Sequence, residues 1–158
     1  MPIPDWVWVV LLSMFPISEL RGGIPLAIIK YDYTCLQAYL ICFLANIAIV
    51  PPILLLLNWA ENWLKKYSWG ERFFNWLWGR IRKGNREEKL KKYGTIALIP
   101  LVAIPLPVTG AWTGSLLAYI LNLDKLKAFL YISLGVAIAG VIMCAAAAGI
   151  KSLEFLLP

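Results

Sequence analysis

Short apolar runs interrupted by proline, glycine and charge alternate with long apolar runs along this chain. The first short runs flank the segment FPISELRGGIP at 15–25, and a continuous apolar run follows at 35–57. A run of about 20 apolar residues can cross a bilayer, whereas each short run is only about half that length. Backbone that turns at membrane depth must be buried in protein or line a wet cavity, because lipid offers no hydrogen-bond partner. The pattern therefore predicts a re-entrant hairpin at about 6–30 and a transmembrane helix at about 35–57.

The second half of the chain repeats this pattern. Two short apolar runs flank a break that contains Pro105, Pro107 and Gly110, and a long apolar run follows at 128–150. We expect a second hairpin at about 95–121 and a second transmembrane helix at about 128–150. Small residues in the last helix permit close helix packing, either within the subunit or across a dimer.

The two halves align with a constant offset of 91 residues, and this register continues without a gap into the long runs. Each half holds one hairpin and one crossing, an odd number of crossings, so the second half is inserted upside down relative to the first. Two full crossings per hairpin would instead make the halves parallel. The prediction is a single all-α membrane domain, 1–158, with inverted repeats at 6–57 and 94–150. The aligned pairs include Pro16/Pro107, Gly23/Gly114, Leu26/Leu117, Ala27/Ala118 and Ile41/Ile132.

Composition and charge give the orientation. The chain is 61% hydrophobic, with a mean hydropathy of +0.72, and a soluble domain is nearer 45–50% apolar. Ten basic and four acidic residues lie between 59 and 93, and ten less four is the whole net charge of +6. A basic cluster between two membrane-like blocks indicates a cytoplasmic loop rather than a nucleic-acid site. We therefore expect a multi-pass inner-membrane protein with its central loop in the cytoplasm and both termini outside.

The central linker, 58–93, has helical periodicity with aromatic residues on one face and basic residues on another. We expect an amphipathic cytoplasmic helix lying on the anionic leaflet, or alternatively a cap packed on the protein's own cytoplasmic end. Within the first span, the Pro51–Pro52 pair predicts a kink or an interruption.

The predicted hairpin tips bring polar groups together near the membrane midplane. Segments 15–25 and 105–114 are expected to be non-helical turns, in which glycine lets backbone approach a ligand and exposes N–H groups. Glu19 is a candidate carrier of a coupling proton, and Arg21 could hold an anionic substrate group or neutralise Glu19. The candidate substrate- or ion-binding residues are Ser18, Glu19, Arg21, Gly22, Gly23, Asn46, Thr109, Gly110, Thr113 and Gly114.

Two structural alternatives stand beside this functional interpretation. Glu19 and Arg21, two residues apart, face each other on extended backbone and could simply lock the turn as an ion pair. Asn46, inside the first span, could contact substrate or ion, or could make an interhelical hydrogen bond.

Nothing in the sequence indicates an enzyme. There is no histidine, no GxSxG segment and no glycine-rich loop followed by lysine, so nucleophilic and phosphate-loop chemistry have no carrier. Cys35, Cys42 and Cys144 lie in apolar surroundings without a CxxC spacing, and we expect reduced, packed thiols. We expect neither a metal nor a cofactor.

Two segments, PISELRGGIP at 16–25 and IPLPVTGAWTGSLLAYIL at 104–121, resemble the small multidrug export protein family. This resemblance covers nearly the whole chain and implies a small bacterial or archaeal inner-membrane exporter. The chain is more distantly similar to the DedA, or SNARE-associated, superfamily, which implies opposed hairpins with acids in one and arginines in the other. Glu19 fits the acidic side, but the second hairpin has no arginine, and Trp112 lies opposite Arg21 in the repeat register.

The combined expectation is a membrane transporter, coupled to protons or sodium, that moves a small or amphipathic substrate between two opposed hairpins. We expect a homodimer embedded in membrane lipids, with no nucleic-acid partner, because so few elements make a thin wall around a site. The alternatives are a DedA-like flippase for polyprenyl-phosphate or phospholipid, and a non-transporting protein that organises envelope lipids through its basic linker.

The location of the net charge yields a test of topology. Cysteines introduced at Lys83 and Lys91 should resist membrane-impermeant thiol reagents in right-side-out vesicles and react after permeabilisation. Ready labelling in sealed vesicles would reverse the orientation.

Overall fold

The computed structural model describes residues 4–68, 71–72, 75, 87–104 and 109–156. All regular secondary structure in these ranges is helical, which confirms the all-α expectation. The helices are α1 (Asp5–Met14), α2 (Glu19–Pro25), the π-helix η1 (Leu26–Lys30), α3 (Cys35–Leu64), α5 (Glu87–Ala103), α6 (Ala111–Ile120) and α7 (Lys125–Leu156).

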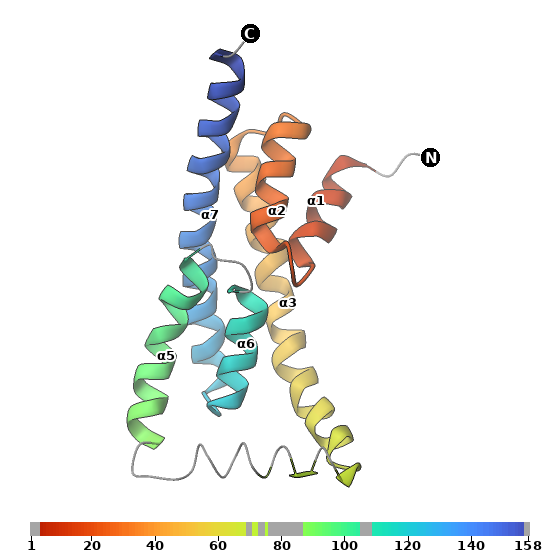
Figure 1. Ribbon diagram of the computed structural model, residues 1–158, viewed down its shortest axis with the longest axis vertical. Coiled ribbons are helices and arrows are strands. Elements are labelled where there is room, and N and C mark those ends of the chain that lie inside the picture. Colours follow the sequence, from red (N-terminus) through yellow and green to blue (C-terminus); the bar gives the residue numbers. More distant parts are fainter. Residues whose placement is uncertain (1–3, 69–70, 73–74, 76–86, 105–108, 157–158) are drawn as a thin grey trace.

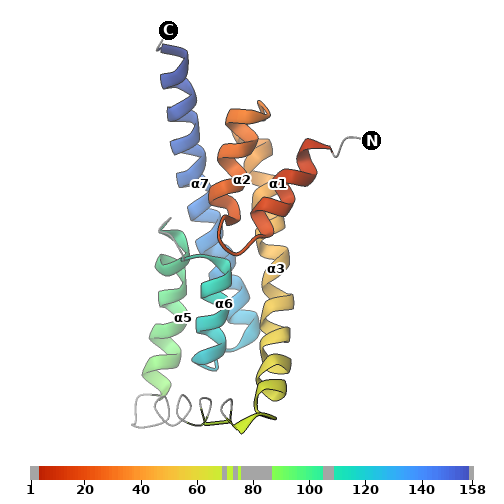
Figure 2. The ribbon, with the colours of Figure 1, turned by 45° about the vertical axis from the view of Figure 1, so that its right-hand side comes forward.

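Two helical hairpins point toward each other along the sides of two long helices (Figure 1). The α1–α2 hairpin and the α5–α6 pair extend from opposite ends, and the α1–α2 turn approaches the start of α6 beside the middle of α3 and α7 in both views (Figure 2). The second arm of each hairpin, α2 or α6, contacts both long helices. The start of α1 and the end of α7 lie at one end of the bundle, and the end of α3 and the start of α5 lie at the other.

The long helices α3 and α7 have the length and composition of membrane spans. A helix of 30 residues is about 45 Å long, enough to cross the hydrocarbon core and its interfaces. Large apolar side chains project outward from both helices, as expected for surfaces that meet lipid. Exposed tryptophans lie at both ends of the bundle, where aromatic belts form: Trp6 and Trp8 on α1, and Trp59 and Trp63 on α3.

The helices extend into the segment assigned to the linker, because α3 continues to Leu64 and α5 begins at Glu87. Pro51 and Pro52 do not interrupt α3, so the expected interruption is wrong. A proline pair removes two backbone hydrogen bonds, and the other bonds and the packing of a long helix hold it together. The rest of the amphipathic prediction falls largely outside the described residues.

The hairpin turns are shorter than predicted. Segment 15–25 was expected to be non-helical, but α2 begins at Glu19, and α6 likewise begins at Ala111. Helix α2 contains Pro25, whose ring would clash within a regular α-helix, and the wider π-helix η1 follows it directly. A π-turn holds one residue more than an α-turn and so accommodates such a local misfit. The first turn is confined to residues 15–18, so Glu19, Arg21 and the two adjacent glycines lie in α2 and not in a non-helical segment.

Glycines on α7 explain how tightly the helices pack within one subunit. A Cβ on Gly135 would lie 2.7 Å from Val102 Cβ and 3.0 Å from the Ile99 carbonyl oxygen, both on α5. A Cβ on Gly140 would lie 2.7 Å from the Tyr39 ring of α3. These small residues serve intramolecular contacts, whereas Gly149 has no neighbour within 4 Å among the described atoms.

Two glycine substitutions on α7 should differ sharply. Gly135→Ala forces a methyl group into backbone and should destabilise the protein by about 1–3 kcal/mol. Gly149→Ala should be neutral or stabilising by up to about 1 kcal/mol, because alanine favours a helix. Thermal unfolding in detergent measures both, and equal effects would contradict the close α5–α7 packing.

Candidate functional site

The turn between α1 and α2 places Glu19 inside the protein. Glu19 has a positive φ of 48°, a conformation that costs energy for a residue with a side chain. Its backbone N–H donates to the Phe15 carbonyl at 2.9 Å, and only 6% of the residue is exposed. The turn thereby directs a carboxylate away from lipid and toward the second hairpin.

The Glu19 carboxylate lies at the N-terminus of α6. The Trp112 backbone N–H donates to Glu19 Oε1 at 3.2 Å, and a Cβ on Gly110 would lie only 1.8 Å from Glu19 Oε2. The first N–H groups of a helix lack intrahelical partners and attract negative charge. Gly110, the residue preceding α6, has no side chain that could cap it. The first hairpin therefore supplies the anion for the second, and glycine makes room for it.

Arg21 and Trp112 extend the contact on either side of Glu19. Arg21 Nη2 donates to Thr109 Oγ1 at 3.0 Å and reaches the Ile104 carbonyl at 3.5 Å. Trp112 Nε1 donates to the Met14 carbonyl at the end of α1, at 3.1 Å. Each hairpin thus donates a hydrogen bond to a carbonyl near the tip of the other. Trp112 stands where the similarity to the DedA superfamily implies an arginine, and its indole N–H is also a donor.

The extended backbone expected between Glu19 and Arg21 is not present, since α2 begins at Glu19. The ion pairs within the described ranges are Lys65–Glu61 and Lys151–Asp32. Glu19 and Arg21 instead bond separately to the second hairpin.

Several predicted site residues serve packing of the hairpins. Ser18 Oγ donates to the Leu12 carbonyl at 2.6 Å, and a Cβ on Gly22 would lie 2.8 Å from Ser18 Cβ. A Cβ on Gly23 would lie 2.0 Å from Ser13 Oγ on α1, and one on Gly114 would lie 2.8 Å from Val102 on α5. Thr113 lies half-buried in the first turn of α6.

Asn46 joins α3 to the first hairpin in a fully buried position. Its Nδ2 donates to the Ser13 carbonyl at 3.0 Å, so the interhelical hydrogen bond is present. Its Oδ1 is buried without a hydrogen-bond partner in the described part of the chain. Because buried acceptors are rarely left unpaired, this oxygen is suited to receive a donor from a water or a ligand.

Polar contacts at both ends of the bundle escaped the sequence analysis. At one end, Glu61 of α3 is 8% exposed, accepts from the Tyr119 hydroxyl of α6 and pairs with Lys65. It borders a cavity of about 150 Å³. At the other end, Lys151 of α7 donates to the Ile28 carbonyl at 3.1 Å and pairs with Asp32 at 2.6 Å. Assigning Glu61 to a linker hid the fact that α3 continues past it.

Two helices long and apolar enough to span a bilayer, joined to hairpins that bury a carboxylate between them, define a membrane protein. The chain belongs to the family described as "Putative small multi-drug export protein", whose model matches residues 19–142. No curated protein and no solved structure matches the chain.

The contact between Glu19 and Gly110 can be tested by a double-mutant cycle. Gly110→Ala should destabilise the protein, because its methyl group displaces the carboxylate. In a Glu19→Ala background, Gly110→Ala should lower the free energy of unfolding by at least about 1 kcal/mol less than it does in the wild type, since the carboxylate that the methyl group displaces is absent. Unfolding in detergent measures the four proteins, and strictly additive effects would contradict the contact.

Proposed function

We propose that this protein is an inverted-repeat transporter that exports a small or amphipathic substrate across the inner membrane. The two hairpins re-enter the membrane from opposite sides, with the basic linker in the cytoplasm, and a homodimer completes the wall around the site. The observation that carries the proposal is the reciprocal contact of the two hairpin tips around the buried Glu19 carboxylate.

Reciprocity is what a two-fold axis between inverted halves requires. Glu19 and Gly110 are equivalent at the offset of 91, and they touch each other. Arg21 and Trp112 are also equivalent, and each reaches a backbone carbonyl near the end of the first arm of the opposite hairpin, Ile104 and Met14, whose positions differ by one residue from exact equivalence. In an isologous interface, a contact from one half to the other is matched by the same contact in the reverse direction.

Burial along the chain supports the same symmetry. Residues 18–27 and 109–118 share their degree of burial at nine of ten positions, at the offset of 91. Residues 31–50 and 121–140 do so at eighteen of twenty positions, but at an offset of 90. The extra residue of the first half falls at the π-helix η1, since a π-turn absorbs one residue. The ungapped register expected for the long helices is thus displaced by one residue.

The position of Glu19 indicates how a proton could be coupled to movement. The charged carboxylate bonds the first turn of α6 and holds the hairpin tips together. Protonation removes that charge and weakens the contact, which allows the tips to separate. An anionic group on a substrate could then take the place of the carboxylate at the same N–H groups, beside the Arg21 guanidinium.

Glu19→Gln should abolish dye export driven by a pH gradient in reconstituted vesicles, because glutamine keeps an acceptor for Trp112 but carries no titratable charge. The transported dye is sulforhodamine B, which carries anionic sulfonate groups, and pyranine inside the vesicles reports proton movement. Arg21→Lys should reduce sulforhodamine movement more than proton movement, because lysine lacks the planar fork that reaches Thr109.

The matched control is Glu71→Gln, which removes the same charge from an exposed linker position and should transport normally. Normal, pH-dependent export by Glu19→Gln would mean that Glu19 has a structural role only. The unfolding temperature of each variant distinguishes a folded protein that no longer transports from a protein that no longer folds.

A further inference from the structure

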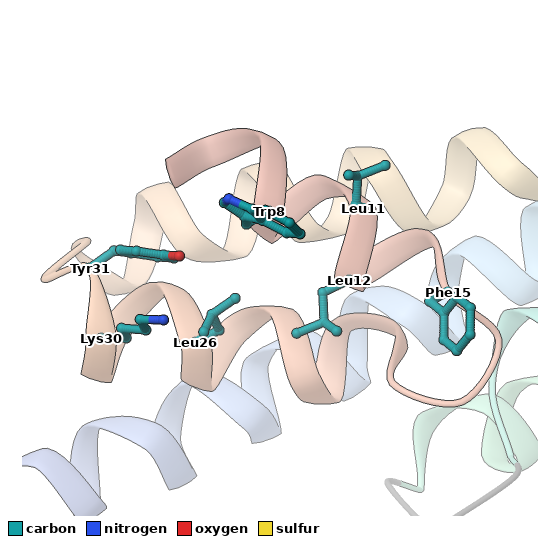
Figure 3. Close-up of a pocket in the computed structure, with 7 residues that line it drawn as sticks. All are labelled: Trp8, Leu11, Leu12, Phe15, Leu26, Lys30 and Tyr31. Carbon is teal, nitrogen blue, oxygen red and sulfur yellow. The ribbon is translucent and has the colours of Figure 1, made fainter. Parts of the chain in front are cut away.

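The first hairpin is open on its outer side. Helix α1 diverges from α2 as it leaves the turn, and a groove of about 740 Å³ lies between α1 and the α2–η1 arm (Figure 3). Trp8, Leu11, Leu12 and Phe15 line it from the α1 side, and Leu26, Lys30 and Tyr31 line it from the other. A volume of several hundred cubic ångströms suits a bound small molecule or lipid chain.

The lining of the groove is polarised along its length. Lys30 and Tyr31 lie at one end, near Trp8, and Phe15 lies at the far end beside the hairpin turn (Figure 3). Lys30 is the one charged residue among those that line it. Its Nζ lies 5.4 Å from the centroid of the Tyr31 ring. A lysine beside a tyrosine, at the end of the groove that also holds a tryptophan, is the composition of a membrane–water interface, and the apolar remainder belongs at the depth of acyl chains.

We propose that this groove binds one acyl chain of an anionic membrane lipid, with the lipid headgroup held by Lys30. A groove that opens toward the side of a membrane protein meets lipid. Its apolar walls favour an acyl chain over a polar molecule, because only the acyl chain buries apolar surface there. The single cation at the mouth selects a negatively charged headgroup over a zwitterionic one. The assignment is independent of transport, because it concerns the outer side of the hairpin and not the Glu19 contact.

Tryptophan quenching by brominated lipids tests this assignment directly. The full-length protein is reconstituted in phosphatidylcholine vesicles that contain an equal small fraction of either brominated phosphatidylglycerol or brominated phosphatidylcholine. The contribution of Trp8 is the difference between wild type and Trp8→Phe. We expect it to be quenched more strongly by the anionic lipid. Trp6, exposed on the same helix but outside the groove lining, is the control, and both lipids should quench its contribution equally.

Substitution of the cation tests headgroup selection. Lys30→Gln should abolish the preference for the anionic lipid at Trp8, and Lys30→Arg should keep it. Lys127→Gln removes the same charge from the start of α7, away from the groove, and should leave the preference unchanged. Circular dichroism verifies the helix content of each variant, and Lys30→Arg provides a folded positive control.

Three results would overturn the proposal. Equal quenching of Trp8 by both lipids in wild type would show lipid contact without headgroup selection. A preference that survives in Lys30→Gln would place the headgroup elsewhere. Absence of quenching at Trp8, with cross-linking between cysteines placed at Leu11 in two subunits, would show that a second copy of the chain covers the groove.

Discussion

A buried carboxylate and an uncapped helix depend on each other at the centre of this structure. The Glu19 carboxylate has left water and needs donors, and the first N–H groups of a helix lack intrahelical partners and need an acceptor. Each supplies what the other lacks. The positive φ of Glu19 and the missing side chain of Gly110 are the local conditions that let them meet. Because the two groups come from different hairpins, the same contact also fixes how the halves of the chain lie against each other.

Much of this arrangement could be predicted from sequence, because breaks in membrane helices are conspicuous. Proline, glycine and charge marked both turns, and Glu19 stood out as an acid inside an apolar block. The partners of Glu19 could not be predicted, because backbone N–H groups carry no sequence signal. Proline in α2 suggested a longer break, yet the chain places it before a π-turn and keeps the helix. The low helix propensity of proline is overridden here by tertiary packing.

Other features lay beyond sequence reasoning for a different reason. Glu61 belongs by composition to a charged linker, and only the continuation of α3 beside α6 buries it against Tyr119. The divergence of α1 from α2 likewise depends on how α1 packs on α3, which no local pattern encodes. Sequence periodicity locates a helix, but the angle at which it leaves a turn is set by the side chains of its neighbours.

The unequal contacts at the two ends of the bundle respond differently to salt. Lys151 and Asp32 meet near water, where the Asp32 side chain is 81% exposed, and such ion pairs contribute about 0–1 kcal/mol and weaken as salt rises. Glu61 is enclosed, with Lys65 at the end of its own helix and the Tyr119 hydroxyl from α6, and moving α6 away removes the hydroxyl donor from a buried carboxylate. The polar contact that joins α7 to the first hairpin is therefore more sensitive to salt than the one that joins α3 to the second hairpin.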